Sequence, residues 1–201
     1  MSLLSAFSRG RFSIPHNVKY RILDKDGNAK PIFQENALCR YLVGKTGWRS
    51  PLWINGWYAR LLAPFLGFWA MERDVSNLVT DAGKAGIASR INGSGGEAAF
   101  TYIAMGTGTA AANAADTTLQ TELSTSGLSR ANSTVSRVTT DVTNDTARLV
   151  NTFSVTGTVA VTESGVLNAS SGGVLGARQV FTAVNVVNGD SLQTTWSLDV
   201  D

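Results

Sequence analysis

The stretch FTYIAMGTGTAAANAADTTLQTEL, from Phe100 to Leu123, divides the chain into two parts of different composition. Its apolar start predicts a strand over about residues 99–105, and Gly106 and Gly108 supply the structural turn that follows. After a polar loop, residues 116–123 have the pattern of one short helix. Tryptophan is concentrated before this stretch, whereas threonine, serine and valine predominate after it. The two parts therefore need separate interpretation.

The part after this stretch is a series of short predicted strands. Apolar and polar residues alternate between turn sequences such as Asn144-Asp145 and Asn188-Gly189-Asp190. Many short strands at near-regular spacing are typical of an antiparallel sandwich or barrel. We expect a mainly β fold, an antiparallel and jelly-roll-like β-sandwich over residues 95–201. The strands expected after the first cover about residues 130–138, 147–155, 158–168, 174–182 and 192–200.

A small β-hairpin is predicted near the start of the chain. Residues 18–36 alternate polar and apolar side chains around Asp26-Gly27-Asn28, a sequence suited to a tight hairpin turn. Two strands alone are marginally stable in water. We therefore expect this hairpin to be supported by the rest of the chain or by another subunit.

A helix is predicted over about residues 80–91. Asn92-Gly93 supplies the left-handed residue that ends many helices. Gly83 and Gly86 each weaken such a helix by about 1 kcal/mol, and close approach to a neighbouring strand would offset that cost. Ser94-Gly95-Gly96 then forms a flexible joint. The chain is therefore expected to have three parts: an anchoring arm over residues 1–75, a helix and joint over 76–94, and the sandwich over 95–201.

The expected arm contains an aromatic-rich segment that holds four of the five tryptophans of the chain. Two interpretations fit it equally well. Its aromatic face is either buried inside the protomer or forms a docking surface, since Trp and Tyr are enriched at the centres of protein interfaces. A membrane-surface helix fits less well because the segment has no lysine-rich polar face. The predicted interface residues are Trp48, Trp53, Trp57, Tyr58, Phe65, Phe68 and Trp69.

Composition argues against several other classes of protein. The formal net charge is +2, and the basic residues do not form the dense patch expected of a nucleic-acid surface. The start of the chain lacks the pattern of a secretory signal. The most apolar stretch, residues 51–71, is interrupted by Asn55, Arg60 and two prolines, so no membrane span is expected.

No enzyme or cofactor site is expected. Cys39 and His16 are the single cysteine and histidine, too few for zinc ligation or a Ser-His or Cys-His nucleophile. Gly106-Thr107-Gly108-Thr109 follows a strand, but it lacks the spacing of a phosphate-binding loop. Asp141, Asn144 and Asp145 lack the spacing of an EF-hand, so a turn is expected there. Nothing in the sequence brings Glu163 and Asp190 together as the carboxylate pair that sugar hydrolysis would need.

Glu163 and Arg178 lie in successive predicted strands joined by the turn at residues 169–173. Glu163 precedes the turn by about as many residues as Arg178 follows it, and this similar spacing predicts a cross-strand pair. The alternative is that both side chains are solvated. If the pair is buried, loss of either member should destabilise the protein.

The strands are also poor in charge. Between Leu149 and Val200 the Asp, Glu, Lys and Arg residues are only Glu163, Arg178, Asp190 and Asp199. Isolated sheets commonly protect themselves from strand addition with charged side chains. We therefore expect a homo-oligomer or a subunit of a larger assembly.

Four segments of the chain form a pattern in a fixed order: Tyr102–Thr109, Asp116–Leu123, Thr162–Ala169 and Leu175–Phe181. Together they resemble a domain of structural proteins from tailed bacteriophages, of the kind named tail fibre, baseplate or virion structural proteins. The lead-in NLVTDAG at residues 77–83 is also similar, and the order of the segments is the most specific feature. The resemblance covers about residues 77–200. It implies a β-sandwich that assembles into a virion and has no enzymatic activity.

The resemblance leads to one main hypothesis and two alternatives. The main hypothesis is a non-enzymatic tail, baseplate or fibre component, anchored through the aromatic arm to other virion proteins. One alternative is a capsid decoration protein whose arm clamps capsid subunits by burying apolar surface. The other is a module that binds host-surface glycans through exposed aromatics and Asn/Asp loops. Virion localisation is expected for the first two.

Overall fold

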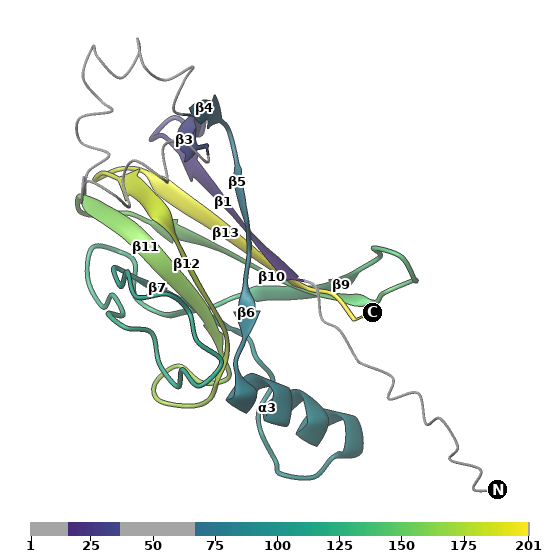
Figure 1. The fold of residues 1–201 in the computed structure, drawn as a ribbon. Helices are drawn as coiled ribbons and strands as arrows, with labels where there is room; N and C mark the ends of the chain where they lie inside the picture. The colour runs from purple at the N-terminus through teal and green to yellow at the C-terminus, as the bar shows by residue number, and fades with distance from the viewer. Residues whose placement is uncertain (1–15, 37–66, 201) are drawn as a thin grey trace, which may run out of the picture.

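The computed structural model describes residues 16–36 and 67–200, and within them the fold is mainly β with one helix (Figure 1). Every strand pairing in this part of the chain is antiparallel. The prediction of a mainly β protein with antiparallel sheets is confirmed. The predicted aromatic residues from Trp48 to Phe65 lie outside the described residues.

The first sheet has the order β2-β1-β13-β10-β9, with β5 also paired to β1. Burial alternates from residue to residue along β1 from Val18 and along most of β13, as expected for strands with one face on the core. Its strands are β1 (His16–Leu23), β2 (Ala29–Lys30), β5 (Arg73–Ser76), β9 (Thr134–Val138), β10 (Thr146–Ser154) and β13 (Ser191–Leu198).

The second sheet has the order β6-β12-β11-β7-β8, and a separate two-stranded sheet pairs β3 with β4. Between Val161 and Glu163 the register of β11 on β12 shifts, so β12 carries a bulge there. The strands of the second sheet are β6 (Leu78–Val79), β7 (Tyr102–Gly106), β8 (Ala131–Asn132), β11 (Val159–Leu167) and β12 (Leu175–Val186), and those of the small sheet are β3 (Ile32–Glu35) and β4 (Gly67–Ala70).

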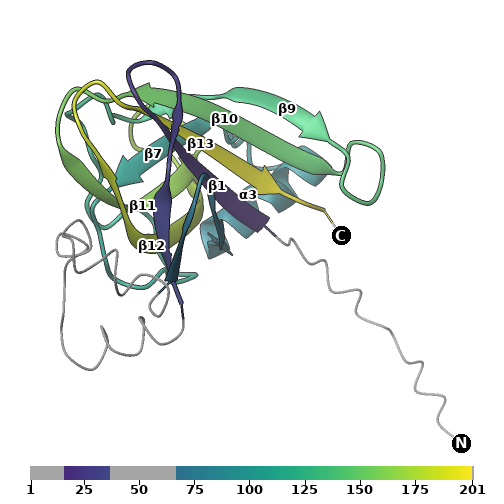
Figure 2. The ribbon, with the colours of Figure 1, turned by 90° about the horizontal axis from the view of Figure 1, so that it is seen from above.

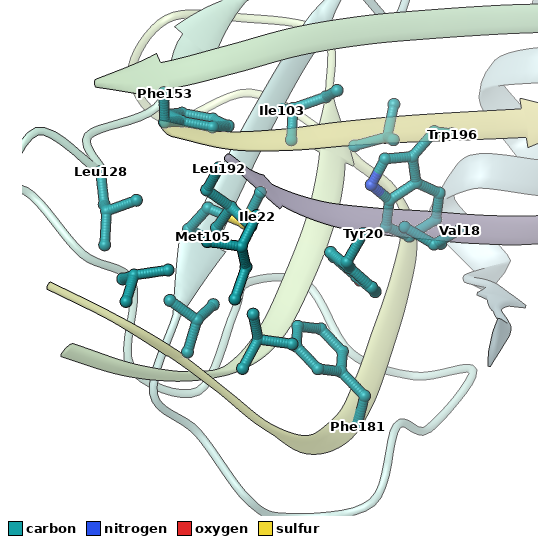
Figure 3. Close-up of a cluster of buried hydrophobic side chains, with 14 of the residues drawn as sticks. Val18, Tyr20, Ile22, Ile103, Met105, Leu128, Phe153, Phe181, Leu192 and Trp196 are labelled. Atoms are coloured by element: carbon teal, nitrogen blue, oxygen red, sulfur yellow. The ribbon is translucent and has the colours of Figure 1, made fainter. Parts of the chain in front are cut away.

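Both large sheets contribute side chains to one hydrophobic core (Figure 3). Tyr20 and Trp196 of the first sheet are fully buried, as are Ile103 and Met105 of the second. The rings of Tyr20 and Phe181 lie 4.2 Å apart between their centroids, so β1 and β12 are in direct contact. Burial of such side chains stabilises a fold by about 1.5–3 kcal/mol each, which makes this shared core the main source of stability.

The hairpin strand β1 is part of this core. It pairs along all eight of its residues with β13, from His16 opposite Leu198 to Leu23 opposite Ser191. The turn that joins β1 to β2 has Gly27 at a φ of 83°, a conformation that glycine adopts without strain. The expectation that the hairpin is supported by another part of the chain is confirmed. The proposed division into three parts stays a prediction, because pairing does not show which parts fold independently.

The helix α3 (Asp81–Asn92) agrees with the prediction to within one residue at each end. The Thr80 hydroxyl accepts the N–H of Gly83 at 2.9 Å, and Gly93 ends the helix in the left-handed conformation. A Cβ on Gly83 would collide with the Gly176 carbonyl of β12. The expected close approach of the helix to a strand is therefore present.

The predicted short helix at residues 116–123 is absent, and that prediction was wrong. The segment runs extended beside β7: Leu123 N–H donates to Met105 O at 2.8 Å, and Thr107 N–H donates to Thr121 O at 3.0 Å. The backbone N–H groups of Gln120 and Thr121 are held by a distant side chain rather than by carbonyls one helical turn earlier. A local helical pattern was overruled by tertiary hydrogen bonds.

Candidate functional site

The carboxylate of Glu163, on β11, is the centre of a hydrogen-bond network in the second sheet. No part of this residue is exposed to solvent. Oε1 accepts the backbone N–H groups of Gly108 at 3.0 Å and Thr121 at 2.7 Å, and Oε2 accepts that of Gln120 at 3.0 Å. One side chain therefore holds both ends of the loop over residues 107–121.

Arg178, on the neighbouring strand β12, completes the network. Its Nε and Nη2 donate to Oε2 of Glu163 at 2.9 and 2.8 Å. Nη1 donates to Asp116 at 2.7 Å, and Nη2 also donates to the carbonyl of Ala110 at 3.2 Å. The guanidinium thus ties two further points of the loop to the sheet.

The structure places Glu163 and Arg178 in the contact that the sequence predicted, but with a different register. Glu163 lies opposite Val180, and Arg178 lies opposite Gly165. The two side chains meet diagonally across the strands, a distance that a long arginine side chain can span. Both are buried, so the alternative that they are solvated is wrong.

Gly106 and Gly108 serve this network by their lack of a side chain. A Cβ on Gly106 would lie 2.5 Å from Glu163 Oε1, and one on Gly108 would also collide with that carboxylate. Neither glycine has a positive φ. The conformational freedom expected from the sequence is therefore not what these positions use; they allow the backbone to approach a buried carboxylate.

Two members of the network, Asp116 and Arg178, have pKa values that are shifted in favour of their charged forms. Desolvation alone would raise the pKa of Asp116, but the Asn113 N–H and Arg178 outweigh it and hold that pKa below its usual value. Desolvation opposes the charged form of Arg178, and hydrogen bonds to Glu163 and Asp116 outweigh it, so the pKa of Arg178 is raised. The contact between Asp116 and Arg178 thus favours the ionised form of both side chains.

A second ion pair, between Arg130 and Glu122, joins two loops of the second sheet. Arg130 donates from Nε and Nη2 to the two carboxylate oxygens of Glu122 at 2.8 and 2.7 Å. Its Nη1 donates to the carbonyls of Ala169 and Gly172 at 3.0 and 2.8 Å. Arg130 therefore connects the segment after β7 to the turn between β11 and β12.

Sequence reasoning missed Asp116, Glu122 and Arg130. Between residues 98 and 136 these three are the only Asp, Glu, Lys or Arg residues. Their scarcity was the available signal, because a charge retained in a charge-poor segment often has a specific partner. Asp116 pairs with Arg178, 62 residues away in the chain, and Arg130 also reaches carbonyls 39 and 42 residues away, so local spacing does not identify these contacts.

The network is suited to holding a loop and not to acid–base chemistry. Glu163 accepts five hydrogen bonds, which occupy both of its carboxylate oxygens. A general base needs a lone pair that faces a substrate, and these oxygens face the protein backbone. The arrangement fixes the loop over residues 107–121 to the sheet, and we call Glu163, Arg178 and the loop groups that they bind the clamp.

The other polar candidates are parts of turns. The Asp145 carboxylate accepts the N–H groups of Thr140, Asp141 and Val142, so it closes the turn between β9 and β10. Asp190 Oδ2 accepts hydrogen bonds from Lys30 Nζ at 2.7 Å and from the N–H of Val187 at 3.1 Å. Within residues 16–36 and 67–200 no group of three or more His, Cys, Asp or Glu residues is arranged to hold a metal.

Two of the seven predicted interface aromatics lie in the described residues, both on β4. Phe68 is 59% exposed and Trp69 is 45% exposed, and Met71 beside them is 55% exposed. The Trp69 ring meets Phe33 of β3 edge-on, with 5.3 Å between centroids. Phe68 and Trp69 are successive residues of a strand, so they expose apolar surface on opposite faces of the small sheet, and Met71 follows the strand. The interface role of these side chains stays a prediction.

Comparisons with known proteins identify no relative. No protein-family model, no curated protein and no solved structure matches the chain. In the part of the chain that the structure describes, the helix is too short and too polar to cross a membrane.

Proposed function

We propose that this chain is a non-enzymatic structural subunit of a tailed-bacteriophage virion, a tail, baseplate or fibre component. In this proposal its two large sheets form a jelly-roll-like β-sandwich. The aromatic part before residue 75 attaches the subunit to other virion proteins. The subunit works without a cofactor and localises to the particle.

The observation that carries the proposal is the convergence of the resembling segments on one network. Gly108 follows β7, Asp116 and Thr121 lie in the second segment, Glu163 is on β11 and Arg178 is on β12. The four segments that resemble phage structural proteins thus each supply part of a single clamp.

The lead-in segment at residues 77–83 is connected to the same place. Leu78 of β6 lies opposite Arg178, and Thr80 N–H donates to the Gly176 carbonyl at 3.1 Å. A resemblance whose separate pieces meet in space is more consistent with a shared domain than one whose pieces are scattered. This supports the transfer of the structural role to this chain.

The exposed apolar side chains Phe68, Trp69 and Met71 on and after β4 support attachment through the aromatic part. Aromatic and methionine side chains are enriched at interface centres, where they bury large areas. The clamp around Glu163 supports a structural role rather than catalysis, because its polar groups are occupied by the protein itself.

The test is incorporation into particles of a phage that lacks its own copy of the gene. The double variant Phe68→Ser/Trp69→Ser should enter particles much less than the wild-type protein while keeping its circular dichroism spectrum. Ile91→Ser is the matched control, because Ile91 is 76% exposed on α3, away from β4. Equal incorporation of the double variant and the control would refute attachment through Phe68 and Trp69.

Quantitative mass spectrometry of the purified particles then separates the alternatives. A tail, baseplate or fibre component should be present in a small multiple of three or six copies, whereas a decoration protein should be present in hundreds. Absence from purified particles would refute the virion proposal. Binding of the isolated chain to a glycan array, lost in Trp69→Ser, would then favour the glycan-binding alternative.

A further inference from the structure

The strand β9 has a free edge in the part of the chain that the structure describes. It pairs on one side with β10, from Thr134 opposite Val150 to Val138 opposite Thr146. No described strand pairs with its other side, and Figure 2 shows β9 at the margin of its sheet. Backbone N–H and C=O groups along a free edge are a template for another strand.

β9 is the longest edge strand of the two large sheets. The other described strands at edges, β2, β6 and β8, have two residues each, and β5 has four. β5 also carries Asp74, which pairs with Lys19 at 3.8 Å. Very short and charged edge strands are common means of preventing strand addition.

Of these protective features β9 has only one charged side chain, Arg137. Its sequence TVSRV contains no proline, lysine or acidic residue, and its register on β10 has no bulge. The first four residues of β9 are all exposed. One of them, Val135, is an apolar residue that strongly favours strands, and 54% of its surface is exposed to solvent. The edge is therefore regular, accessible and nearly uncharged.

We propose that β9 pairs antiparallel with β9 of a second copy of this chain, about a two-fold axis at Ser136. The pairing joins two six-stranded sheets into one continuous sheet and completes hydrogen bonds that a lone copy leaves to water. It concerns the isolated protein and does not rest on the proposed virion role.

The residues of β9 fit this self-pairing. With Ser136 opposite Ser136 of the second copy, Val135 lies opposite Arg137 and Thr134 lies opposite Val138. The aliphatic stem of each Arg137 then covers the exposed Val135 of the other copy. Like charges directly opposite each other would destabilise the pair, and this register places no two like charges in that position.

The neighbouring surface also tolerates a second copy. On the outward face of β10, Arg148 lies opposite Ser136 and Val150 lies opposite Thr134. Arg148 is exposed and is the one charged side chain at these positions, and in the pair both β9 strands separate it from the Arg148 of the second copy. A dense field of one charge sign would repel an identical copy, and one arginine per copy at this separation is not such a field. The contact is nevertheless small, so we expect a dimer that forms only as the concentration rises.

Sedimentation equilibrium of the full chain over a wide concentration range tests the proposal. The wild-type protein should pass from monomer to dimer. Ser136→Glu and Ser136→Lys should each weaken the dimer about tenfold or more, because position 136 meets its own copy. A mixture of the two variants should recover dimerisation. Thr152→Glu, an exposed change on the same face, should dimerise like the wild-type protein.

A covalent test avoids dependence on affinity and on the stability of the charged variants. Residues directly opposite each other on paired strands are close enough for a disulfide. Oxidised Ser136→Cys in a Cys39→Ser background should run as a crosslinked dimer, and Thr152→Cys should not. A wild-type protein that stays monomeric at all concentrations, or a dimer unaffected by Ser136→Glu, would overturn the proposal, as would equal crosslinking at both positions.

Discussion

Arg178 donates two hydrogen bonds to a single carboxylate oxygen of Glu163, at 2.8 and 2.9 Å, and neither residue is more than 2% exposed. The two strands that carry them bring the guanidinium across diagonally, and the remaining carboxylate oxygen holds backbone N–H groups of the loop over residues 107–121. The pair therefore determines where that loop lies.

Replacing Glu163 by glutamine should lower the free energy of unfolding by about 3–5 kcal/mol, because buried Arg178 would lose its fully buried countercharge and keep only the partly exposed Asp116. Urea denaturation of both proteins measures the difference. Glu72→Gln is the control, since Glu72 makes an ion pair with Arg21 on the surface, where such pairs contribute little. Similar small losses in the two variants would contradict a stabilising role for the buried pair.

Gly108→Ala should destabilise the protein by about 1–3 kcal/mol, because its Cβ would collide with the Glu163 carboxylate. Thr109→Ala changes an exposed side chain in the same loop and keeps the backbone bond to Gln120. Thermal unfolding of the two variants should separate them clearly. If Gly108→Ala unfolds at the wild-type temperature, the loop is able to move away from the carboxylate without cost.

The stability of the protein should depend on Asp145 in acid. The Val142 N–H, followed by those of Thr140 and Asp141 and the Thr146 hydroxyl, holds the pKa of Asp145 well below its ordinary value of 3.8. The folded state therefore binds fewer protons than the unfolded state in this range, and stability rises with pH. The contribution is complete above pH 3.8 and is lost as pH falls below that value toward the lower folded pKa.

Urea midpoints measured from neutral pH down through this range test the effect of Asp145. Asp145→Asn should be less stable than the wild-type protein at neutral pH, and the difference should shrink as the pH falls below 3.8. A difference that stays constant with pH would show that the carboxylate's ionisation is not the cause.

Tyr20→Ala should cost about 3–5 kcal/mol, because it removes a fully buried ring that contacts Phe181 in the shared core. Lys19→Ala, the adjacent exposed position, should change stability by less than about 0.5 kcal/mol. The comparison tests whether β1 is part of the core or a detachable arm. Equal effects would favour a detachable arm.

This result also decides how attachment should be studied. Deleting residues 1–75 would remove β1, which pairs along its length with β13. Loss of incorporation by such a truncated protein would follow from unfolding alone. Point substitutions at Phe68 and Trp69 avoid this problem because both side chains are exposed.

Local features of the sequence were sufficient for the elements that depend on neighbouring residues. The helix Asp81–Asn92 was predictable because its cap at Thr80 and its left-handed Gly93 lie within the segment itself. The turn at Gly27 and the alternating strands from β10 to β13 were predictable for the same reason. Propensity, turn chemistry and burial pattern agreed at these positions.

The candidate site was predictable only in part. The Glu163–Arg178 pair was visible because one short turn joins their strands, which limits the possible registers. Asp116, Glu122 and Arg130 were not, because their partners depend on loops whose course is set by the whole sheet. The interface roles of Phe68 and Trp69 and the assembly state stay predictions.

The stretch from Phe100 to Leu123 separates what the sequence determined from what the tertiary structure decided. The sequence by itself determined the strand at Tyr102–Gly106, because a short apolar run that ends at a glycine turn is typical of a buried strand. Only the tertiary structure decided the path of residues 116–123. Glu163, 42 and 43 residues farther along the chain, accepts the N–H groups of Thr121 and Gln120. A buried carboxylate must be satisfied by donors, and that demand outweighed the weak local preference for a helix.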